Sequence, residues 1–324
     1  MTGHVLVARL DSAGDVLLAG PAVRAVARRA DTVTFLAGPR GSSAAALLPG
    51  VDRVLQFEAA WVEADPPALT DAAVRALIEC VRMLAPDEAL ISTSAHQSPL
   101  PLAMLLRMAG VPRISAITTD HAGSLLDVRH RVNDDMPEQI RALSLAVAAG
   151  YPPGSHRLRV RDDLPEVAEL TGGPGYVVLH PGATEPARRM SAPRSRQVAA
   201  ALAEAGHRVV VTGSAAERSL TDAVAGGHAR DLGGATDLAC FAAVLRDADA
   251  VVAPNTGAAP LAAAVATPVV SLFAPVVPAR HWAPYGVPTV VLGDQRTPCG
   301  RYGLDAIPDV AIVSATEQVL RATD

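Results

Sequence analysis

Short apolar runs alternate along the chain with longer segments whose apolar residues recur at helical spacing. This alternation is typical of a parallel α/β sheet, because the crossover between two parallel strands usually contains a helix. Residues 120–137 are polar and irregular. Elsewhere in the first half, the pattern predicts strands at 4–10, 32–36, 53–57, 89–93 and 113–117, and helices at 15–29, 42–48, 68–84, 100–108 and 138–149.

The pattern restarts after a change in composition. Residues 150–153 and 172–174 are rich in glycine and proline and bracket a charged segment, which predicts a linker. We expect two Rossmann-like domains, 1–160 and 161–324, facing a central cleft, and the last helix is a candidate to pack back on the first domain. The second half predicts strands at 176–180, 207–212, 250–253 and 269–273, and helices at 194–205, 217–225, 238–246, 258–265 and 310–322.

Composition narrows the class of protein. A chain of 324 residues with 50% hydrophobic residues is long enough for two cores and excludes a disordered polypeptide. The net charge of -5 argues against a nucleic-acid binder, which needs a basic face. The apolar run near the first residue is too short for a signal peptide. The uncharged stretch 250–279 contains five prolines, which argues against a membrane helix, so we expect a cytoplasmic protein.

Cysteine usage suggests neither a disulfide framework nor a zinc site. The three residues, Cys80, Cys240 and Cys299, are far apart and form no CxxC pair.

Polar residues that directly follow a strand are candidate site residues, because ligands of such sheets bind at the carboxyl ends of the strands. The first candidate is Asp15, in the turn after the first strand. One interpretation is that Asp15 points into the cleft. The other is that it caps the next helix, since an acid in the first turn satisfies free N–H groups. The turn contains neither a GxGxxG fingerprint nor a Walker lysine.

The loop after the first strand of the second half is the next candidate. It offers the Thr184 hydroxyl and the fixed positive charges of Arg188 and Arg189, which suit phosphate oxygens. A solvated basic loop is the alternative interpretation.

Two further strand ends carry candidates. Glu217 can accept hydrogen bonds from both hydroxyls of a ribose. The alternative interpretation is that its carboxylate only interacts favourably with the dipole at the start of a helix. Asn255, Thr256 and Gly257 precede an alanine-rich helix whose first N–H groups are unpaired, which suits a diphosphate. Asn255 or Thr256 can also cap that helix, and a cap there shapes the same anion site.

Four motifs in order along the chain resemble glycosyltransferase family 9, the family of the ADP-heptose:lipopolysaccharide heptosyltransferases. They are GDVLLAGPAVRAV, VVLHPGA, VVVTGSAAE and ADAVVAPNTGAAPLAAAVATPVVSLFAP. The resemblance extends from about residue 5 to residue 293. It implies a GT-B fold, a nucleotide sugar held mainly by the second domain, and transfer with inversion.

The resemblance also assigns roles to the candidate residues. It implies that Asp15 is the general base and that Glu217 binds the nucleoside. Thr184 and Arg188 match a Thr and a Lys that contact the donor's phosphates and sugar. Thr256 and Gly257 match the Thr-Gly of the family's D-T-G-x-x-H motif, where the diphosphate docks.

The chain departs from the family at several of these positions. Asn255 stands where the motif has Asp, and Pro260 stands where it has His. Met190 and Ser191 replace a Trp-Pro pair. Asn255 can still hydrogen-bond sugar hydroxyls, whereas the loss of His removes a possible partner of the diphosphate.

All 28 basic residues are Arg, and alanine is abundant, which indicates GC-rich coding and an actinobacterial source. Such organisms generally lack lipopolysaccharide, so the expected acceptor is an envelope glycan or a secondary metabolite. The predicted function is inverting transfer of a sugar from a nucleotide-sugar donor such as ADP-heptose, without an obligatory metal or other cofactor. A degenerate family member that binds a nucleotide or a partner without transfer is the alternative. A nicotinamide-dependent oxidoreductase is disfavoured by the missing glycine fingerprint.

Overall fold

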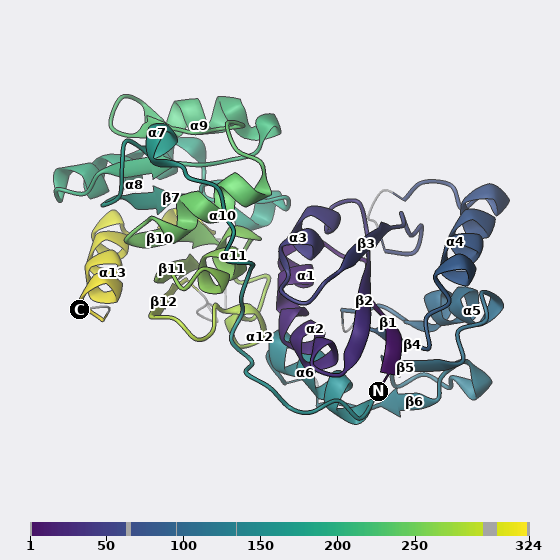
Figure 1. Ribbon diagram of the computed structural model, residues 1–324. Coiled ribbons are helices and arrows are strands. Elements are labelled where there is room, and N and C mark those ends of the chain that lie inside the picture. The colour runs from purple at the N-terminus through teal and green to yellow at the C-terminus, as the bar shows by residue number, and fades with distance from the viewer. Residues whose placement is uncertain (1, 63–65, 95, 134, 294–302, 323–324) are drawn as a thin grey trace. The chain divides into compact units, whose positions relative to one another are not determined.

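The chain divides into two compact units, Met1–His156 and Arg157–Asp324. The structure, a computed structural model, describes residues 2–62, 66–94, 96–133, 135–293 and 303–322. Each unit contains one parallel sheet of six strands with helices on its faces (Figure 1). The α/β class predicted from the alternating pattern is therefore confirmed.

The first sheet has the strand order β3-β2-β1-β4-β5-β6, and all its pairs are parallel. Ala8 of β1 lies opposite Leu36 of β2 and Ile91 of β4. The strands β2 and β3 are added on one side of β1, and the strands β4, β5 and β6 are added on its other side. The carboxyl ends of β1 and β4 therefore form a topological switch point. The strands are β1 (Thr2–Arg9), β2 (Ala30–Ala37), β3 (Arg53–Gln56), β4 (Glu88–Ile91), β5 (Arg113–Ile117) and β6 (Val128–His130).

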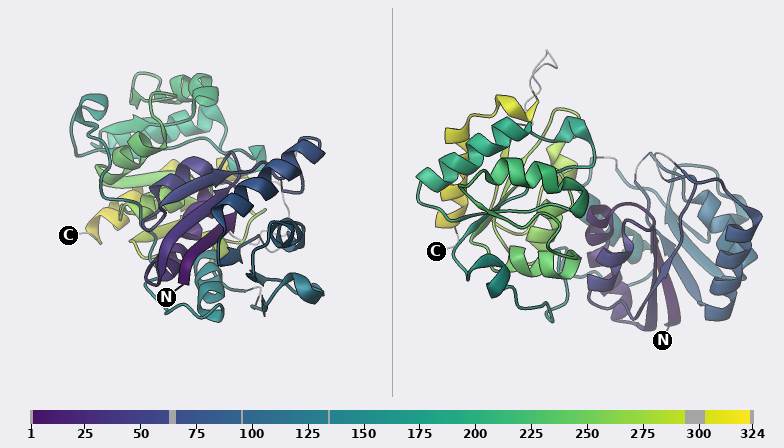
Figure 2. Two further views of the ribbon diagram at one scale, coloured as in Figure 1. Left: turned by 45° about the vertical axis from the view of Figure 1, so that its right-hand side comes forward. Right: turned by 90° about the horizontal axis from the view of Figure 1, so that it is seen from above.

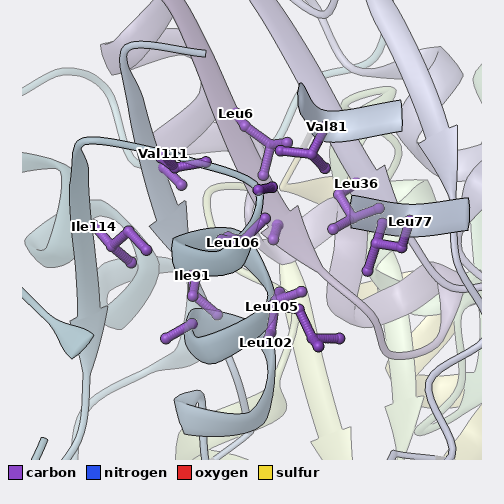
Figure 3. Close-up of a cluster of buried hydrophobic side chains, with 14 of the residues drawn as sticks. Leu6, Leu36, Leu77, Val81, Ile91, Leu102, Leu105, Leu106, Val111 and Ile114 are labelled. Atoms are coloured by element: carbon purple, nitrogen blue, oxygen red, sulfur yellow. The ribbon is translucent and has the colours of Figure 1, made fainter. Parts of the chain in front are cut away.

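Helices cover both faces of the first sheet. On one face, α4 (Asp71–Leu84) and α5 (Leu100–Met108) pack against alternate residues of the strands (Figure 3). The side chains that they bury there include Leu77, Val81, Leu102, Leu105 and Leu106. Successive side chains of a strand point to opposite faces of the sheet, so the remaining apolar side chains of the strands lie on the opposite face. That face is covered by α1 (Ala13–Leu18), α2 (Gly20–Ala27), α3 (Ser42–Leu47) and α6 (Glu138–Ala148).

The single helix predicted at 15–29 is two helices, α1 and α2, which meet at Ala19. Pro21 causes the break, because it lacks the N–H that a continuous helix needs and is tolerated in the first turn of a new one. As a result α1 is short, and Asp15 lies in its first turn.

The second sheet has the order β12-β11-β10-β7-β8-β9 and is also parallel throughout. With the strands numbered within each unit, both sheets have the Rossmann order 3-2-1-4-5-6. The switch point of the second sheet lies between β7 and β10. Its strands are β7 (Val177–Leu179), β8 (Val209–Val211), β9 (Arg230–Asp231), β10 (Ala250–Pro254), β11 (Val269–Leu272) and β12 (Thr289–Leu292).

The last helix, α13 (Asp309–Arg321), packs on its own unit, against β10, β11 and β12. Its buried residues Ile312, Ala315 and Val319 share a core with Val252 and Leu272, so burial of its apolar face fixes its place. Figure 2 shows helices on both faces of this sheet. The others are α7 (Ala168–Thr171), α8 (Ala192–Glu204), α9 (Arg218–Ala225), α10 (Leu238–Arg246), α11 (Ala258–Ala264) and α12 (Ala279–Trp282).

Cys80 and Cys240 carry free thiols, and Cys299 lies outside the described residues. Among the helices that the structure describes, none has the length and apolar character needed to cross a membrane.

Candidate functional site

Asp15 lies directly after β1, at the carboxyl edge of the first sheet. The Ser12 hydroxyl donates a hydrogen bond to Asp15 Oδ2 at 2.6 Å, and the Ser12 N–H donates to the same oxygen at 3.3 Å, which completes a capping box. Arg9 Nη2 donates to Asp15 Oδ1 at 3.2 Å. The side chain of Asp15 remains 18% exposed. Asp15 therefore serves as a helix cap and also presents a carboxylate at the sheet edge.

Arg9 is the centre of a charged cluster around Asp15. Its side chain is 2% exposed; Nε lies 2.6 Å from Asp11 Oδ2, and Nη1 lies 3.4 Å from Glu138 Oε2. Nη2 also donates to Ser94 Oγ at 2.9 Å. Burial alone would lower the pKa of the guanidinium, but the three carboxylates outweigh it and raise the pKa above its ordinary value. The cluster thus orders three carboxylates around one buried cation.

The loop after β4 is tied to the loop after β1. Gln97 Nε2 donates to Asp11 Oδ1 at 2.6 Å, and the Ser94 N–H donates to Gln97 Oε1 at 3.2 Å. Arg141 of α6 donates a hydrogen bond to the Thr93 carbonyl oxygen. These bonds fix the two loops that meet at the switch point of the first sheet.

In the second unit, Glu217 occupies a defined position at the end of β8. It is the last residue of the short 3₁₀ helix Ala215–Glu217, and its Oε2 accepts from the Ser214 N–H at 2.8 Å and the Ser214 hydroxyl at 2.7 Å. The loop after β7 passes close by, since a Cβ on Gly182 would lie 2.0 Å from Glu217 Oε1. Only glycine at position 182 leaves room for this carboxylate.

His180 joins the loops after β7 and β8. Its Nδ1 forms a 3.1 Å hydrogen bond with Thr212 Oγ1, and its ring lies 5.4 Å from the ring of Phe241. Burial lowers the pKa of His180, although the nearby Glu217 carboxylate acts in the opposite direction. Burial would raise the pKa of Glu217, but the Ser214 hydrogen bonds and the charges of His180 and Arg189 lower it overall. Glu217 is therefore kept as a carboxylate.

The long loop after β7 carries the predicted phosphate ligands. Thr184 and Arg189 are exposed and Arg188 is half-buried, at the end of the 3₁₀ helix Pro186–Arg188. The Arg188 guanidinium makes no hydrogen bond or ion pair with the residues that the structure describes. Of the two arginines, Arg189 is the one whose charge acts on Glu217.

Asn255, Thr256 and Gly257 follow β10, which pairs with β7 through Val252 and Leu179. All three residues are half-buried. The Ala258 N–H donates to Thr256 Oγ1 at 3.3 Å, so Thr256 satisfies one free donor at the start of α11. This segment lies at the switch point of the second sheet, next to the loop that contains His180.

Two of the four positions that depart from the family motif are buried, whereas Asn255 is half-buried and Ser191 is exposed. Met190 is 5% exposed and belongs to the core of the second unit, while Pro260 is buried in the first turn of α11. The Ser191 N–H donates to Asp305 Oδ1 at 2.7 Å. Met190 and Pro260 are therefore packing residues in this chain.

The predicted site residues fall into two groups. Asp15 lies in the first unit, and all the predicted donor-binding residues lie in the second unit, after β7, β8 or β10. Sequence reasoning missed Arg9, Glu138 and His180. An arginine inside an apolar strand and a histidine directly at a strand end were the available signals. Among the described residues, no group of three or more His, Cys, Asp or Glu is arranged to hold a metal ion.

Comparison with known proteins gives a consistent picture. A family model described as Glycosyltransferase family 9 (heptosyltransferase) matches residues 94–303. The structure of E. coli ADP-heptose lps heptosyltransferase II is similar, with a TM-score of 0.79, 20% identity and 99% of each chain covered. A family 9 glycosyltransferase from Veillonella parvula DSM 2008 gives a TM-score of 0.80 at 16% identity, over 98% of this chain and 97% of that chain.

E. coli heptosyltransferase WaaC with ADP-2-deoxy-2-fluoro heptose gives a TM-score of 0.77 at 20% identity, over 97% of this chain and 99% of that chain. Comparison with curated proteins gives no sequence match. At these identities the solved structures show the fold, which is GT-B.

Proposed function

The chain belongs to glycosyltransferase family 9, and we propose that this glycosyltransferase moves a heptose from ADP-heptose, or a related nucleotide sugar, to a hydroxyl of its acceptor. The transfer inverts the anomeric carbon, and the acceptor is an envelope glycan or a secondary metabolite. The observation that carries the proposal is the Asp15 carboxylate, which is partly exposed at a sheet switch point and held by Ser12 and Arg9.

Asp15 acts as the general base of the proposed reaction. The acceptor oxygen attacks the anomeric carbon, its proton passes to the Asp15 carboxylate, and the bond from that carbon to the diphosphate oxygen breaks. The contacts with Ser12 and Arg9 hold the carboxylate in one orientation, which favours a productive geometry. The leaving group is the nucleoside diphosphate.

The second unit supplies the donor-binding groups. Arg188 and Thr184 hold the diphosphate, and the start of α11 at Thr256 and Gly257 stabilises the charge that develops on it. Support for this role comes from Arg188, whose charge is not compensated by any described residue. We propose no obligatory metal.

Glu217 and Asn255 recognise the rest of the donor. The Glu217 carboxylate is held in place by its hydrogen bonds with Ser214 and accepts hydrogen bonds from the ribose hydroxyls. The Asn255 side chain hydrogen-bonds the sugar in place of the family's Asp. The same substitution, together with Pro260, favours the alternative of a protein that binds a nucleotide without transfer.

A thermal-shift panel of nucleoside diphosphates and nucleotide sugars tests the proposal, because a ligand of the native state raises the melting temperature by mass action. We expect ADP and ADP-heptose to stabilise the chain more than the uridine and guanosine analogues do. Release of ADP from ADP-heptose in the presence of hydroxyl acceptors is the second measurement. If ADP stabilised the chain but no acceptor led to release of ADP from ADP-heptose, the non-catalytic alternative would be favoured.

A further inference from the structure

His180 lies directly after β7, at the switch point of the second sheet. Its backbone N–H donates to the Val252 carbonyl oxygen of β10 at 2.9 Å, which ties it to the neighbouring strand. The loops that follow these two strands contain the proposed ligands of the diphosphate, with Thr184 and Arg188 after β7 and Thr256 after β10. His180 is therefore well placed to contact the same ligand, yet none of the roles proposed above involves it.

The neighbours of the His180 ring hold it in one orientation. Its Nδ1 forms a 3.1 Å hydrogen bond with Thr212 Oγ1, and its ring lies 5.4 Å from the Phe241 ring at an interplanar angle of 31°. Thr212 is buried, and Nδ1 is the only partner of its hydroxyl among the described residues. Because a buried hydroxyl donates its hydrogen where an acceptor is available, Nδ1 accepts, and the hydrogen of the neutral ring is on Nε2.

The Nε2–H group of His180 is an available hydrogen-bond donor. Nε2 has no hydrogen-bond partner among the described residues, and it is not one of their fully buried polar atoms, because the ring is only half-buried. Desolvation lowers the pKa of His180 below its ordinary value of 6.5, so the ring is neutral near pH 7 and offers an N–H group rather than a positive charge. A ligand of this group needs an acceptor oxygen.

The neighbouring Glu217 carboxylate indicates which ligand combines with this donor. Gly182, two residues after His180, lies against Glu217 Oε1, and the charge of Glu217 acts on His180. Its Oε2 is bonded to Ser214, whereas Oε1 makes no hydrogen bond with the described residues. The ends of β7 and β8 thus present a donor and an acceptor to the same ligand. A ribose hydroxyl can donate to the carboxylate, and the phosphate attached to that ribose can accept from Nε2.

The start of α11 offers fewer donors to a phosphate than a helix start usually does. The N–H groups of Ala258 and Ala259 are bonded to Thr256, and Pro260 has no N–H. The first three residues of this helix therefore have no donor left for an anion. The His180 Nε2–H group supplies one from the neighbouring strand end.

We propose that His180 is a further donor-binding residue, whose Nε2–H group donates a hydrogen bond to an oxygen of the α-phosphate of a nucleoside diphosphate. The α-phosphate is the one attached to the ribose that Glu217 holds. The contact therefore distinguishes a phosphorylated nucleoside from a free one. This inference rests on the proposed function, because it concerns the same donor site.

Two substitutions of His180 separate this contact from a purely structural role. The side-chain amide of glutamine reaches the position of Nε2, whereas that of asparagine reaches only the position of Nδ1, next to Thr212. We expect His180→Gln to bind ADP within about threefold of the unmodified chain, and His180→Asn to bind it about tenfold more weakly, measured by isothermal titration. If His180 only anchored its loop to Thr212, the order of the two affinities would be reversed.

Two further variants complete this comparison. His180→Phe keeps a ring beside Phe241 but has no nitrogen, and it should lose as much ADP affinity as His180→Asn does. His228→Asn is the matched control. His228 is exposed and precedes β9, so it lies at the opposite edge of the sheet, and its substitution leaves ADP affinity unchanged. Thermal melting of each variant verifies that it is folded.

The contacted atom is tested with the two diastereomers of ADP in which sulfur replaces one non-bridging oxygen of the α-phosphate. Sulfur is a weaker hydrogen-bond acceptor than oxygen, so we expect the two to bind the unmodified chain with different affinities. The ratio of these affinities should change by about threefold in His180→Asn and by less in His180→Gln, as a double-mutant cycle requires of a direct contact. An unchanged ratio in His180→Asn would exclude the α-phosphate as the partner.

The outcomes separate this inference from the proposed function. If the unmodified chain binds ADP and the folded His180→Asn and His180→Phe variants bind it equally well, the inference is overturned and the proposed function stands. If the affinities follow the expected order but no acceptor leads to release of ADP from ADP-heptose, the contact is supported and the proposed transfer is overturned. Absence of ADP binding to the unmodified chain would overturn both.

Discussion

The Asp15 carboxylate caps α1 and also contacts Arg9, so its substitution must separate a structural effect from a catalytic one. In Asp15→Asn the amide oxygen keeps the capping geometry, but the group no longer accepts a proton. We expect the transfer rate to fall by about 100-fold or more, the usual contribution of a general base, while ADP binding and folding persist. Initial rates of ADP release, together with ADP thermal shifts, measure both effects.

Asp11 is the competing base, and it provides the control for that experiment. It is 7% exposed and bonded to both Arg9 and Gln97, so Asp11→Asn is expected to reduce stability more than Asp15→Asn does. An active Asp15→Asn enzyme beside an inactive, folded Asp11→Asn enzyme would transfer the assignment to Asp11. If neither substitution slowed a demonstrable transfer reaction, the base mechanism would be wrong.

Arg188 is expected to bind the donor diphosphate through its uncompensated charge. Arg188→Ala should weaken ADP binding by about 1.5–3 kcal/mol, the scale of a charge-assisted hydrogen bond. Arg189→Ala is the matched control: it removes an adjacent charge that acts on Glu217, and we expect a smaller loss. Isothermal titration with ADP gives both values. Unchanged affinity in Arg188→Ala would remove this residue from the site.

Gly182 controls the position of the Glu217 carboxylate. In Gly182→Ala the new methyl group would lie 2.0 Å from Glu217 Oε1, so the flexible carboxylate must move away from Ser214 while the backbone stays in place. We expect normal folding and an ADP affinity reduced about as much as in Glu217→Gln, roughly 1–3 kcal/mol. Gly303→Ala is the control, since no atom of the described residues lies within 4 Å of its added methyl group. An ADP affinity equal to that of the unmodified chain would exclude Glu217 as a ligand.

At the scale of elements, all the interior strands were predicted from their apolar runs, whereas the edge strands β6, β9 and β12 were not. The run from His4 to Leu10 predicts a buried strand, and β1 occupies it. The strand β9 has only two residues, both charged and exposed, so its pairing with β8 leaves no hydrophobic signal. A periodic pattern of apolar residues arises because one face of an element is buried. An edge strand that is held mainly by backbone hydrogen bonds does not need such a pattern.

The candidate site was predictable to the extent that it follows strand ends. Asp15 and Glu217 were found because a turn after a strand lies at the sheet's carboxyl edge. The contact between Arg9 and Glu138 joins residues 129 positions apart, and only the packing of α6 against the sheet brings them together. Such pairs depend on tertiary structure, so the sequence offered only the unusual arginine within an apolar strand.

His180 joins the loops after β7 and β8 through its hydrogen bond with Thr212, and the burial of its ring predicts a pH effect on stability. The folded-state pKa of His180 is lowered from its ordinary value of 6.5, so near that pH the folded chain binds fewer protons than the unfolded chain. The contribution of His180 is therefore complete above about pH 6.5 and is lost as the pH falls below it.

Urea unfolding between about pH 7.5 and 5 measures this effect. We expect the unmodified chain to lose more stability on acidification than His180→Gln, which has no titrating ring. The lowered pKa of Glu217 adds a loss only at lower pH, below its ordinary value of 4.5. Parallel stability profiles for the two proteins would show that His180 does not titrate differently on folding.

At the scale of the whole molecule, each unit has its own six-stranded sheet and core, so we expect them to fold separately. A cut after His156 leaves the preceding linker attached, because Arg24, Arg28 and Arg29 donate to the carbonyl oxygens of Ser155, Pro153 and Gly150. Fragments 1–156 and 157–324 should each give a cooperative melting transition.

The separated fragments then test how the proposed chemistry is divided. Fragment 157–324 contains all the proposed donor-binding residues, so its affinity for ADP should be within about threefold of that of the full chain and should fall with Arg188→Ala. Neither fragment alone should release ADP from ADP-heptose in an acceptor-dependent manner, because the proposed base belongs to 1–156. Calorimetric titration of fragment 157–324 with ADP is the decisive measurement. A folded fragment without ADP affinity would mean that the donor site requires residues of the first unit, and transfer by fragment 157–324 alone would exclude Asp15 as the base.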